Sequence, residues 1–293
     1  MEQKFGTNLN FLNALMFKLQ TMKLLKICII FIVLAISCDA KPKPAKAVAK
    51  QMKNVSVFDA NTKTIHVFVA LCDNKYQGIV PVPKAIGNGQ DPANNLYWGC
   101  AYGIKGYFKK SKEWKLVKTQ KLDKVRMERL VFKHISKNYY LVADAYDGQY
   151  IKKTTTDFLY SAAGQLKDTI KINKTTIGIN GNAKMVAYIG HDGLMDFQLN
   201  ENFNNADGKQ RDAIILACIS KKYFAPHLTQ AKANPLLWTT GLMAPEAYTL
   251  HDALSSYIAG GTAEQIRNKG AMAYTKFQKC SLKASRNLLV TGY

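Results

Sequence analysis

The sequence predicts an α/β fold, with a mostly parallel sheet and helices on both faces. Two apolar runs carry this prediction, MVAYI at 185–189 and AIILA at 213–217, because each is short and β-favouring, as in strands buried on both faces. Segments with helical periodicity alternate with such runs along the chain, which is typical of βαβ units. With 293 residues and 47% hydrophobic content, the chain can bury a sizeable core.

The first 40 residues are expected to be an export signal and not part of the fold. A basic segment opens at Met22, the expected true start, and the apolar run at 27–37 is too short for a membrane-spanning helix. Two processing routes stay open: lipidation of Cys38, as in a bacterial lipoprotein, or cleavage after Ala40. The mature protein is expected to be exported, either as a lipoprotein at the outer surface or in the periplasm, or as a secreted form.

A Lys/Pro-rich tether is expected at 41–54, ahead of a single α/β domain at 55–293. The tether carries five lysines and two prolines. Its charges repel one another and its prolines favour an extended chain. This segment therefore predicts a spacer between the anchor and the domain.

The chain is strongly basic, with a formal net charge of +21. The Lys105–Lys124 region holds eight lysines against Glu113 and Asp123. This balance favours an anionic lipid or envelope polymer as a partner, although a solvated basic face is the plainer interpretation. No recognition helix or aromatic stacking motif favours nucleic acid, and membrane contact is expected only through the lipid anchor.

The strands of the domain follow from β-favouring apolar runs bounded by turn residues. A Gly/Pro/Asn-rich loop at 73–91 follows the first strand. Residues 125–135 fit either a helix or a strand. Strands are expected at 64–72, 114–119, 139–146, 185–189, 213–217 and 235–240.

The helices follow from start signals and from apolar spacing. Asp91-Pro92 is a favourable start for a helix that runs to about Lys110. A second helix is expected at 155–166, and Pro245 opens a third that runs to about Ile258. Thr262, with Gln265 three residues later, fits a capping box for a last helix that runs to about Cys280.

Six cysteines are present, and four of them lie in the domain: Cys72, Cys100, Cys218 and Cys280. Four cysteines in a domain of this size do not make a disulfide-dense scaffold, and their pairing stays open. The sequence contains no Cys-x-x-Cys pair, so a zinc ribbon or a thioredoxin-type site is not expected. No metal and no cofactor are predicted.

A histidine and a cysteine each follow one of the two central apolar runs. His191 lies in YIGHDG and Cys218 in IILACIS. Chemistry gathers at the carboxyl ends of parallel strands, so the two side chains are expected to face one substrate. The thiolate is the reactive form of cysteine; His191 would act as its base, and Lys221 and Lys222 would favour ionisation. The plainer alternative is a core cysteine and a loop histidine.

This order, a strand ending in His and then a strand ending in Ala-Cys, resembles the caspase-like cysteine peptidases. That group includes caspases, legumains, gingipains, clostripain and the CHAT-type peptidases. The resemblance spans roughly residues 64–260 and implies a divergent bacterial exported member, with Cys218 as nucleophile and His191 as base. The chain departs from the family because Asp192 separates His191 from Gly193, and because the cysteine follows the histidine by only 27 positions.

Supporting groups for this chemistry lie near the two residues in the sequence. The backbone N–H groups of Gly193 and Cys218 are the oxyanion-hole candidates, and Asp192 or Asp196 would orient His191. The expected function is therefore an exported cysteine endopeptidase that hydrolyses a peptide or protein substrate. The alternative is a catalytically inactive caspase-like envelope protein that binds anionic partners through its basic face.

Overall fold

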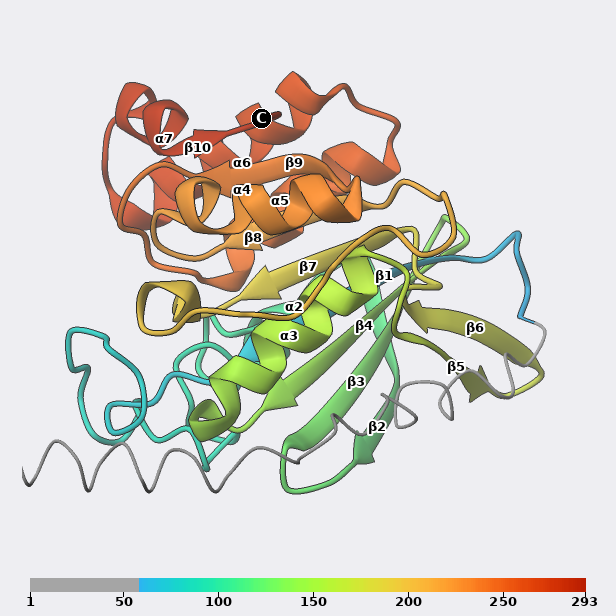
Figure 1. Ribbon diagram of the computed structural model, residues 1–293, viewed down its shortest axis with the longest axis horizontal. Helices are drawn as coiled ribbons and strands as arrows, with labels where there is room; N and C mark the ends of the chain where they lie inside the picture. Colours follow the sequence, from blue (N-terminus) through green and yellow to red (C-terminus); the bar gives the residue numbers. More distant parts are fainter. Residues whose placement is uncertain (1–57) are drawn as a thin grey trace, which may run out of the picture. The chain divides into compact units, whose positions relative to one another are not determined.

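The computed structural model describes residues 58–293 of the unit Asn54–Tyr293 (Figure 1). The predicted signal segment, the lipidation residue Cys38 and the tether at 41–54 lie outside the described residues.

An eight-stranded mixed sheet forms the centre of the described unit, in the order β10-β9-β8-β7-β1-β4-β3-β2. The five strands from β9 to β4 run parallel, while β3, β2 and β10 are antiparallel to their neighbours. The predicted α/β fold with a mostly parallel sheet is confirmed. The strands are β1 Lys63–Ala70, β2 Trp114–Lys121, β3 Arg126–His134, β4 Tyr139–Tyr146, β7 Met185–Ile189, β8 Asp212–Leu216, β9 Asn234–Thr239 and β10 Leu289–Val290.

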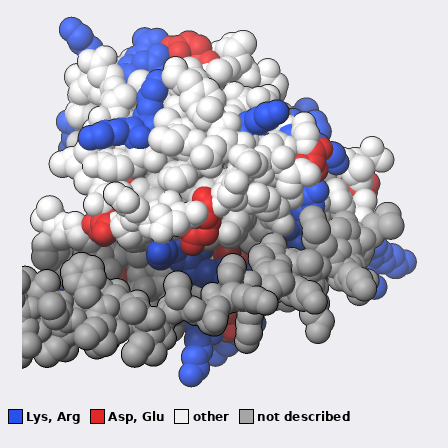
Figure 2. All heavy atoms as spheres, in the orientation of Figure 1, with Lys and Arg blue, Asp and Glu red and all other residues white. Residues whose placement is uncertain are grey.

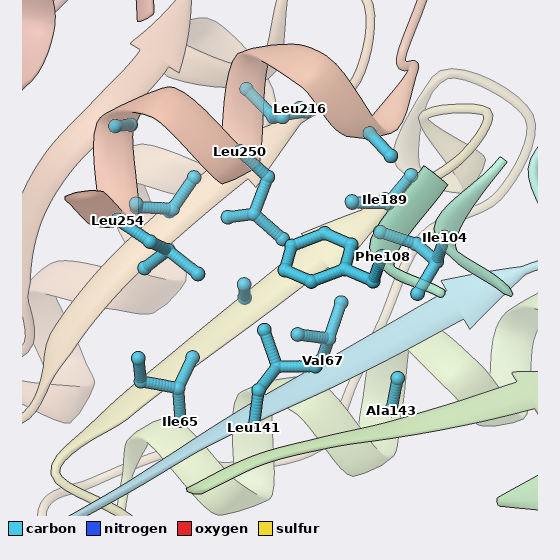
Figure 3. Close-up of a cluster of buried hydrophobic side chains, with 14 of the residues drawn as sticks. Ile65, Val67, Ile104, Phe108, Leu141, Ala143, Ile189, Leu216, Leu250 and Leu254 are labelled. Atoms are coloured by element: carbon cyan, nitrogen blue, oxygen red, sulfur yellow. The ribbon is translucent and has the colours of Figure 1, made fainter. Parts of the chain in front are cut away.

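Helices cover both faces of this sheet because the central strands carry apolar side chains on both of their faces. One face packs against α3 and α4, with Phe68 and Tyr188 beneath Phe158. The other packs against α2, α5 and α6, and Figure 3 shows Phe108 among Val67 and Leu250 on that side. The helices are α2 Ile104–Phe108, α3 Ile151–Ala162, α4 Ser220–Ala231, α5 Ala247–Ile258, α6 Ala263–Gln278 and α7 Leu282–Leu288.

The predicted helix at 91–110 is wrong over most of its length, since only Ile104–Phe108 is α-helical. The segment before it is tied to the end of β1 by Asn95, whose side chain accepts from the N–H of Cys72 and donates to its carbonyl oxygen. Side-chain bonds of this kind compete with helical pairing. One other expectation was confirmed: α6 begins at Ala263, with Thr262 as its N-cap and the predicted capping box. The segment at 125–135, which the sequence left open between helix and strand, contains β3.

A two-stranded hairpin that the sequence analysis did not predict, β5 (Lys167–Ile172) and β6 (Thr175–Asn180), packs on the sheet near β1 and β4. Beneath it lies a buried polar network. The Nε2 of His66 lies 3.2 Å from Asp144, and Arg129 donates two hydrogen bonds of 2.6 Å to the same carboxylate. The N–H of Asn180 donates to Nδ1 of His66, so the hairpin is joined to the sheet.

Candidate active site

Adjacent parallel strands carry His191 and Cys218 to the same edge of the sheet. Ile189 of β7 pairs with Leu216 of β8, and each site residue follows its strand by two positions. Gly190 makes this possible, because its φ is +145° and an added Cβ would lie 2.7 Å from a carbonyl oxygen at the end of β1. Both sequence-predicted residues therefore lie at the carboxyl edge of the sheet, just beyond the ends of neighbouring strands.

Asp196 and Tyr188 hold His191 in place. The imidazole is buried, and its Nε2 lies 2.7 Å from Oδ2 of Asp196, which also accepts from the N–H of Gly78. The Tyr188 hydroxyl donates to the carbonyl oxygen of His191 at 2.8 Å. The Asp196 contact places the proton of the neutral ring on Nε2, so Nδ1 keeps its lone pair. Nδ1 takes part in no hydrogen bond among the described residues, and it is the free basic atom of the ring.

Cys218 occupies a tight turn from strand to helix. Ile219, the next residue, has φ +51°, a left-handed conformation that is strained for a β-branched side chain. Helix α4 begins one residue later at Ser220, so the thiol lies beside a helix N-terminus, where negative charge is favoured. The cysteine is partly exposed to solvent. The turn therefore places the thiol at the carboxyl end of β8.

The thiol of Cys218 rests against the loop that follows β9. The N–H of Met243 donates to Sγ at 3.4 Å, and Sγ lies 3.7 Å from the Met243 carbonyl oxygen. Burial raises the pKa of Cys218; the Met243 N–H opposes this, and the negative charge of Asp192 adds to it. No hydrogen bond joins Cys218 to His191 within residues 58–293. The thiol is therefore held in its un-ionised form, and Nδ1 of His191 has no hydrogen bond within the described residues.

The two lysines expected to favour the thiolate point elsewhere. The Nζ of Lys221 lies 5.6 Å from the centre of the Trp238 ring, and that of Lys222 lies 5.3 Å from the Tyr223 ring. Each of these two ammonium groups therefore makes a cation–π contact with an aromatic ring. The expectation of a lysine-assisted thiolate is therefore not supported by their placement.

Both oxyanion-hole candidates have an unused backbone donor. The N–H groups of Gly193 and Cys218 donate no hydrogen bond among the described residues. An added Cβ at Gly193 would lie 2.6 Å from the Phe197 ring, so a larger residue here would have to displace that ring. These two N–H groups can therefore serve a developing negative charge at the ends of β7 and β8.

The two candidate orienting residues differ in what they touch. Asp196 contacts the His191 ring, whereas Asp192 caps the short 3₁₀-helix Gly193–Met195 by accepting from the N–H of Leu194 at 3.0 Å. Asp192 is fully buried, and its Oδ2 has no hydrogen-bond partner in the structure. Burial, with a further contribution from the charge of Asp196, raises the pKa of Asp192 to about 7.

The remaining cysteines stay apart from this chemistry. All four described cysteines are free, and burial raises the pKa of Cys72 to about 11.

Residues 58–293 contain no group of three metal-ligating side chains placed to hold an ion. In the same part of the chain, no helix has the length and apolar character needed to cross a bilayer.

Sequence reasoning missed Met243 and Tyr188 as parts of the site. Met243 contacts the thiol through backbone atoms, which leave no signal in residue identity. Tyr188 was visible as one of the apolar residues of β7, but nothing local indicates that its hydroxyl reaches the loop after the strand.

Comparison of the chain with models of protein families, with curated proteins and with solved structures finds no match in any of the three.

Proposed function

We propose that this protein is a caspase-like cysteine peptidase in which Cys218 is the nucleophile and His191 the general base. One observation carries the proposal: His191 and Cys218 follow paired ends of adjacent parallel strands, one with a free Nδ1 and the other with a partly exposed thiol. The mostly parallel sheet with helices on both faces agrees with what the family resemblance implies.

The proposed reaction proceeds in two displacements. His191 Nδ1 accepts the thiol proton, and sulfur attacks the carbonyl carbon of the scissile peptide bond. The N–H groups of Gly193 and Cys218 stabilise the oxyanion, which in peptidases contributes about 3–4 kcal/mol per donor. His191 returns its proton to the departing amine, and water then hydrolyses the thioester with the same base. The carboxylate of Asp196 stabilises the imidazolium between these steps.

Substrate has to displace the resting contact with Met243. The loop at 240–246 holds the thiol through one N–H and one carbonyl group, the same groups that an extended peptide offers. Catalytic hydrogen bonds are often long or absent before substrate binds. The absence of a His191–Cys218 bond in the resting site is therefore compatible with the proposal.

The test is iodoacetamide labelling of Cys218, followed by mass spectrometry from pH 5 to 9, together with hydrolysis of a peptide library by the full chain in mild detergent. We expect Cys218→Ala to abolish hydrolysis and His191→Ala to slow both labelling near pH 7 and hydrolysis, the latter by about 100-fold or more. Cys100→Ala is the matched control and leaves both unchanged. An ordinary thiol profile that is insensitive to His191→Ala, with no hydrolysis, would reject the peptidase.

A second candidate function rests on the basic face. Six of the eight lysines in the Lys105–Lys124 region are exposed, and Figure 2 shows lysine and arginine side chains in several separate groups on one face. A catalytically inactive caspase-like envelope protein would use these charges to bind an anionic lipid or polymer. Such a protein tolerates Cys218→Ala and loses binding to anionic vesicles when the exposed lysines are replaced by glutamine.

Export is part of the same proposal. We propose that the protein is carried out of the cytoplasm by the signal ending near Cys38 and is anchored by lipid or secreted. Radiolabelled palmitate incorporation that is lost in Cys38→Ala tests the anchored form, and release of the chain into the medium supports the secreted one.

A further inference from the structure

One buried carboxyl at the site has no role in the proposed reaction. Asp192 lies directly after His191, is fully buried and uses Oδ1 to cap Leu194. Its Oδ2 has no hydrogen-bond partner among the described residues. An unpartnered buried carboxyl costs free energy, so its presence here calls for an explanation beyond capping.

The charged neighbours of Asp192 leave it without a counter-ion in the described part of the chain. Its own loop supplies the His191–Asp196 pair, in which the two partners already satisfy each other. The end of β8 supplies Cys218, whose pKa the Asp192 charge raises, and β7 supplies the Tyr188 hydroxyl. The ionisable residues of the adjacent helices are engaged elsewhere: Lys152 over the Phe197 ring, Lys153 with Asp157, Lys221 over Trp238 and Lys222 over Tyr223.

We propose that Asp192 is a charge gate for the nucleophile: its ionised carboxylate opposes formation of the Cys218 thiolate, and protonation of Asp192 removes that opposition. The inference rests on the function proposed above and concerns its regulation by pH. Asp192 acts through the thiol and is a positioning residue, not a catalytic one. The family resemblance does not imply this role, because the family has glycine directly after the histidine.

The sign of the effect follows from electrostatics. Because burial raises the pKa of Asp192 to about 7, its charge appears as the pH rises through neutrality. A like charge nearby disfavours the thiolate, so thiol ionisation is held back above pH 7 and unopposed below it. Replacing Asp192 by asparagine keeps the shape and the Oδ1 acceptor for Leu194 but removes the charge.

The experiment measures the rate of iodoacetamide labelling at Cys218 in the full chain, in mild detergent, from pH 5 to 9. We expect Asp192→Asn to label at the wild-type rate at pH 5.5 and about tenfold faster at pH 8, since one charge shifts a neighbouring pKa by about one unit. Asp147→Asn, at another buried aspartate that caps a 3₁₀-helix, is the matched control and leaves the profile unchanged. A ratio that does not change with pH, or the same change in Asp147→Asn, overturns the gate.

Two further measurements separate the gate from the peptidase. If labelling responds as expected but no variant hydrolyses peptides, the gate stands and the peptidase falls. If peptides are hydrolysed with a pH profile that Asp192→Asn leaves unchanged, the peptidase stands and the gate falls. Should Asp192→Asn not fold, the carbon-13 shift of the Asp192 carboxyl in the wild type decides: a midpoint near 7 supports the gate and one near 4 overturns it.

Discussion

Two buried histidines each contact an aspartate in this molecule, and they differ in the hydrogen bonding of their second ring nitrogen. His66 on β1 contacts Asp144 on β4, and its second ring nitrogen accepts from the N–H of Asn180. His191 contacts Asp196, and its second ring nitrogen has no partner within the described residues. The His66–Asp144 pair in the middle of the sheet has both ring nitrogens bonded, and we call it the closed pair. The His191–Asp196 pair at the carboxyl edge leaves one ring nitrogen unbonded among the described residues, and we call it the open pair.

The surroundings explain the difference. Burial lowers the pKa of His66, which outweighs the opposing effect of Asp144 and keeps the imidazole neutral. Burial alone would raise the pKa of Asp144, but the hydrogen bonds from Arg129 and the contact with His66 outweigh it and keep the pKa below its usual value. A polar group whose every atom is partnered stabilises a fold, whereas one with an unused lone pair can do chemistry.

The largest expected effect is a loss of stability when the closed pair loses its arginine partner. Arg129→Met leaves the fully buried Asp144 without its main counter-ion, so we expect unfolding to become easier by about 3–5 kcal/mol. Urea denaturation measures this. Lys105→Met, which removes a half-buried partner of Glu128, is the control and costs less than about 1 kcal/mol. Equal losses in both variants would contradict the importance of the buried network.

The sequence predicted the open pair better than the closed one, for physical reasons. His191 and Asp196 lie five residues apart in the loop that follows an apolar strand, so local pattern suffices to bring them together. Both partners of His66 lie elsewhere in the chain, and Arg129 falls in the segment whose structure stayed ambiguous. Long-range pairing of this kind has no local signal.

The failed helix at 91–110 has a similar cause. The Asp-Pro start and the apolar spacing are favourable locally, but Asn95 bonds to the backbone at the end of β1 and draws the segment into turns. Local start signals cannot register a competing contact with a distant strand. The capping box at Thr262 succeeded because both of its partners are local.

A smaller effect is expected in the pH dependence of stability, through the closed pair. Because the folded-state pKa of His66 is lowered, the unfolded chain binds a proton that the folded chain does not once the pH falls below about 6.5. Stability is fully present above that pH and decreases below it, by up to about 1.4 kcal/mol per pH unit for this one group. We expect His66→Gln to flatten the decrease measured by urea denaturation between pH 7.5 and 5. An unchanged slope would contradict a neutral buried imidazole.

The smallest expected effect concerns the open pair. Asp196→Asn removes the charge that stabilises the imidazolium of His191 but keeps an oxygen that can accept from Nε2 and from the N–H of Gly78. We expect labelling of Cys218 near pH 6.5 to slow by up to about tenfold, because the imidazolium that forms when His191 accepts the thiol proton loses the opposite charge beside it. Stability should change little, since Asp196 is about one-third exposed. Asp252→Asn, which removes a carboxylate beside His251 on α5, is the matched control and should leave labelling unchanged. If both variants label at the wild-type rate, Asp196 only holds the loop, and the imidazolium of His191 is stabilised by other groups.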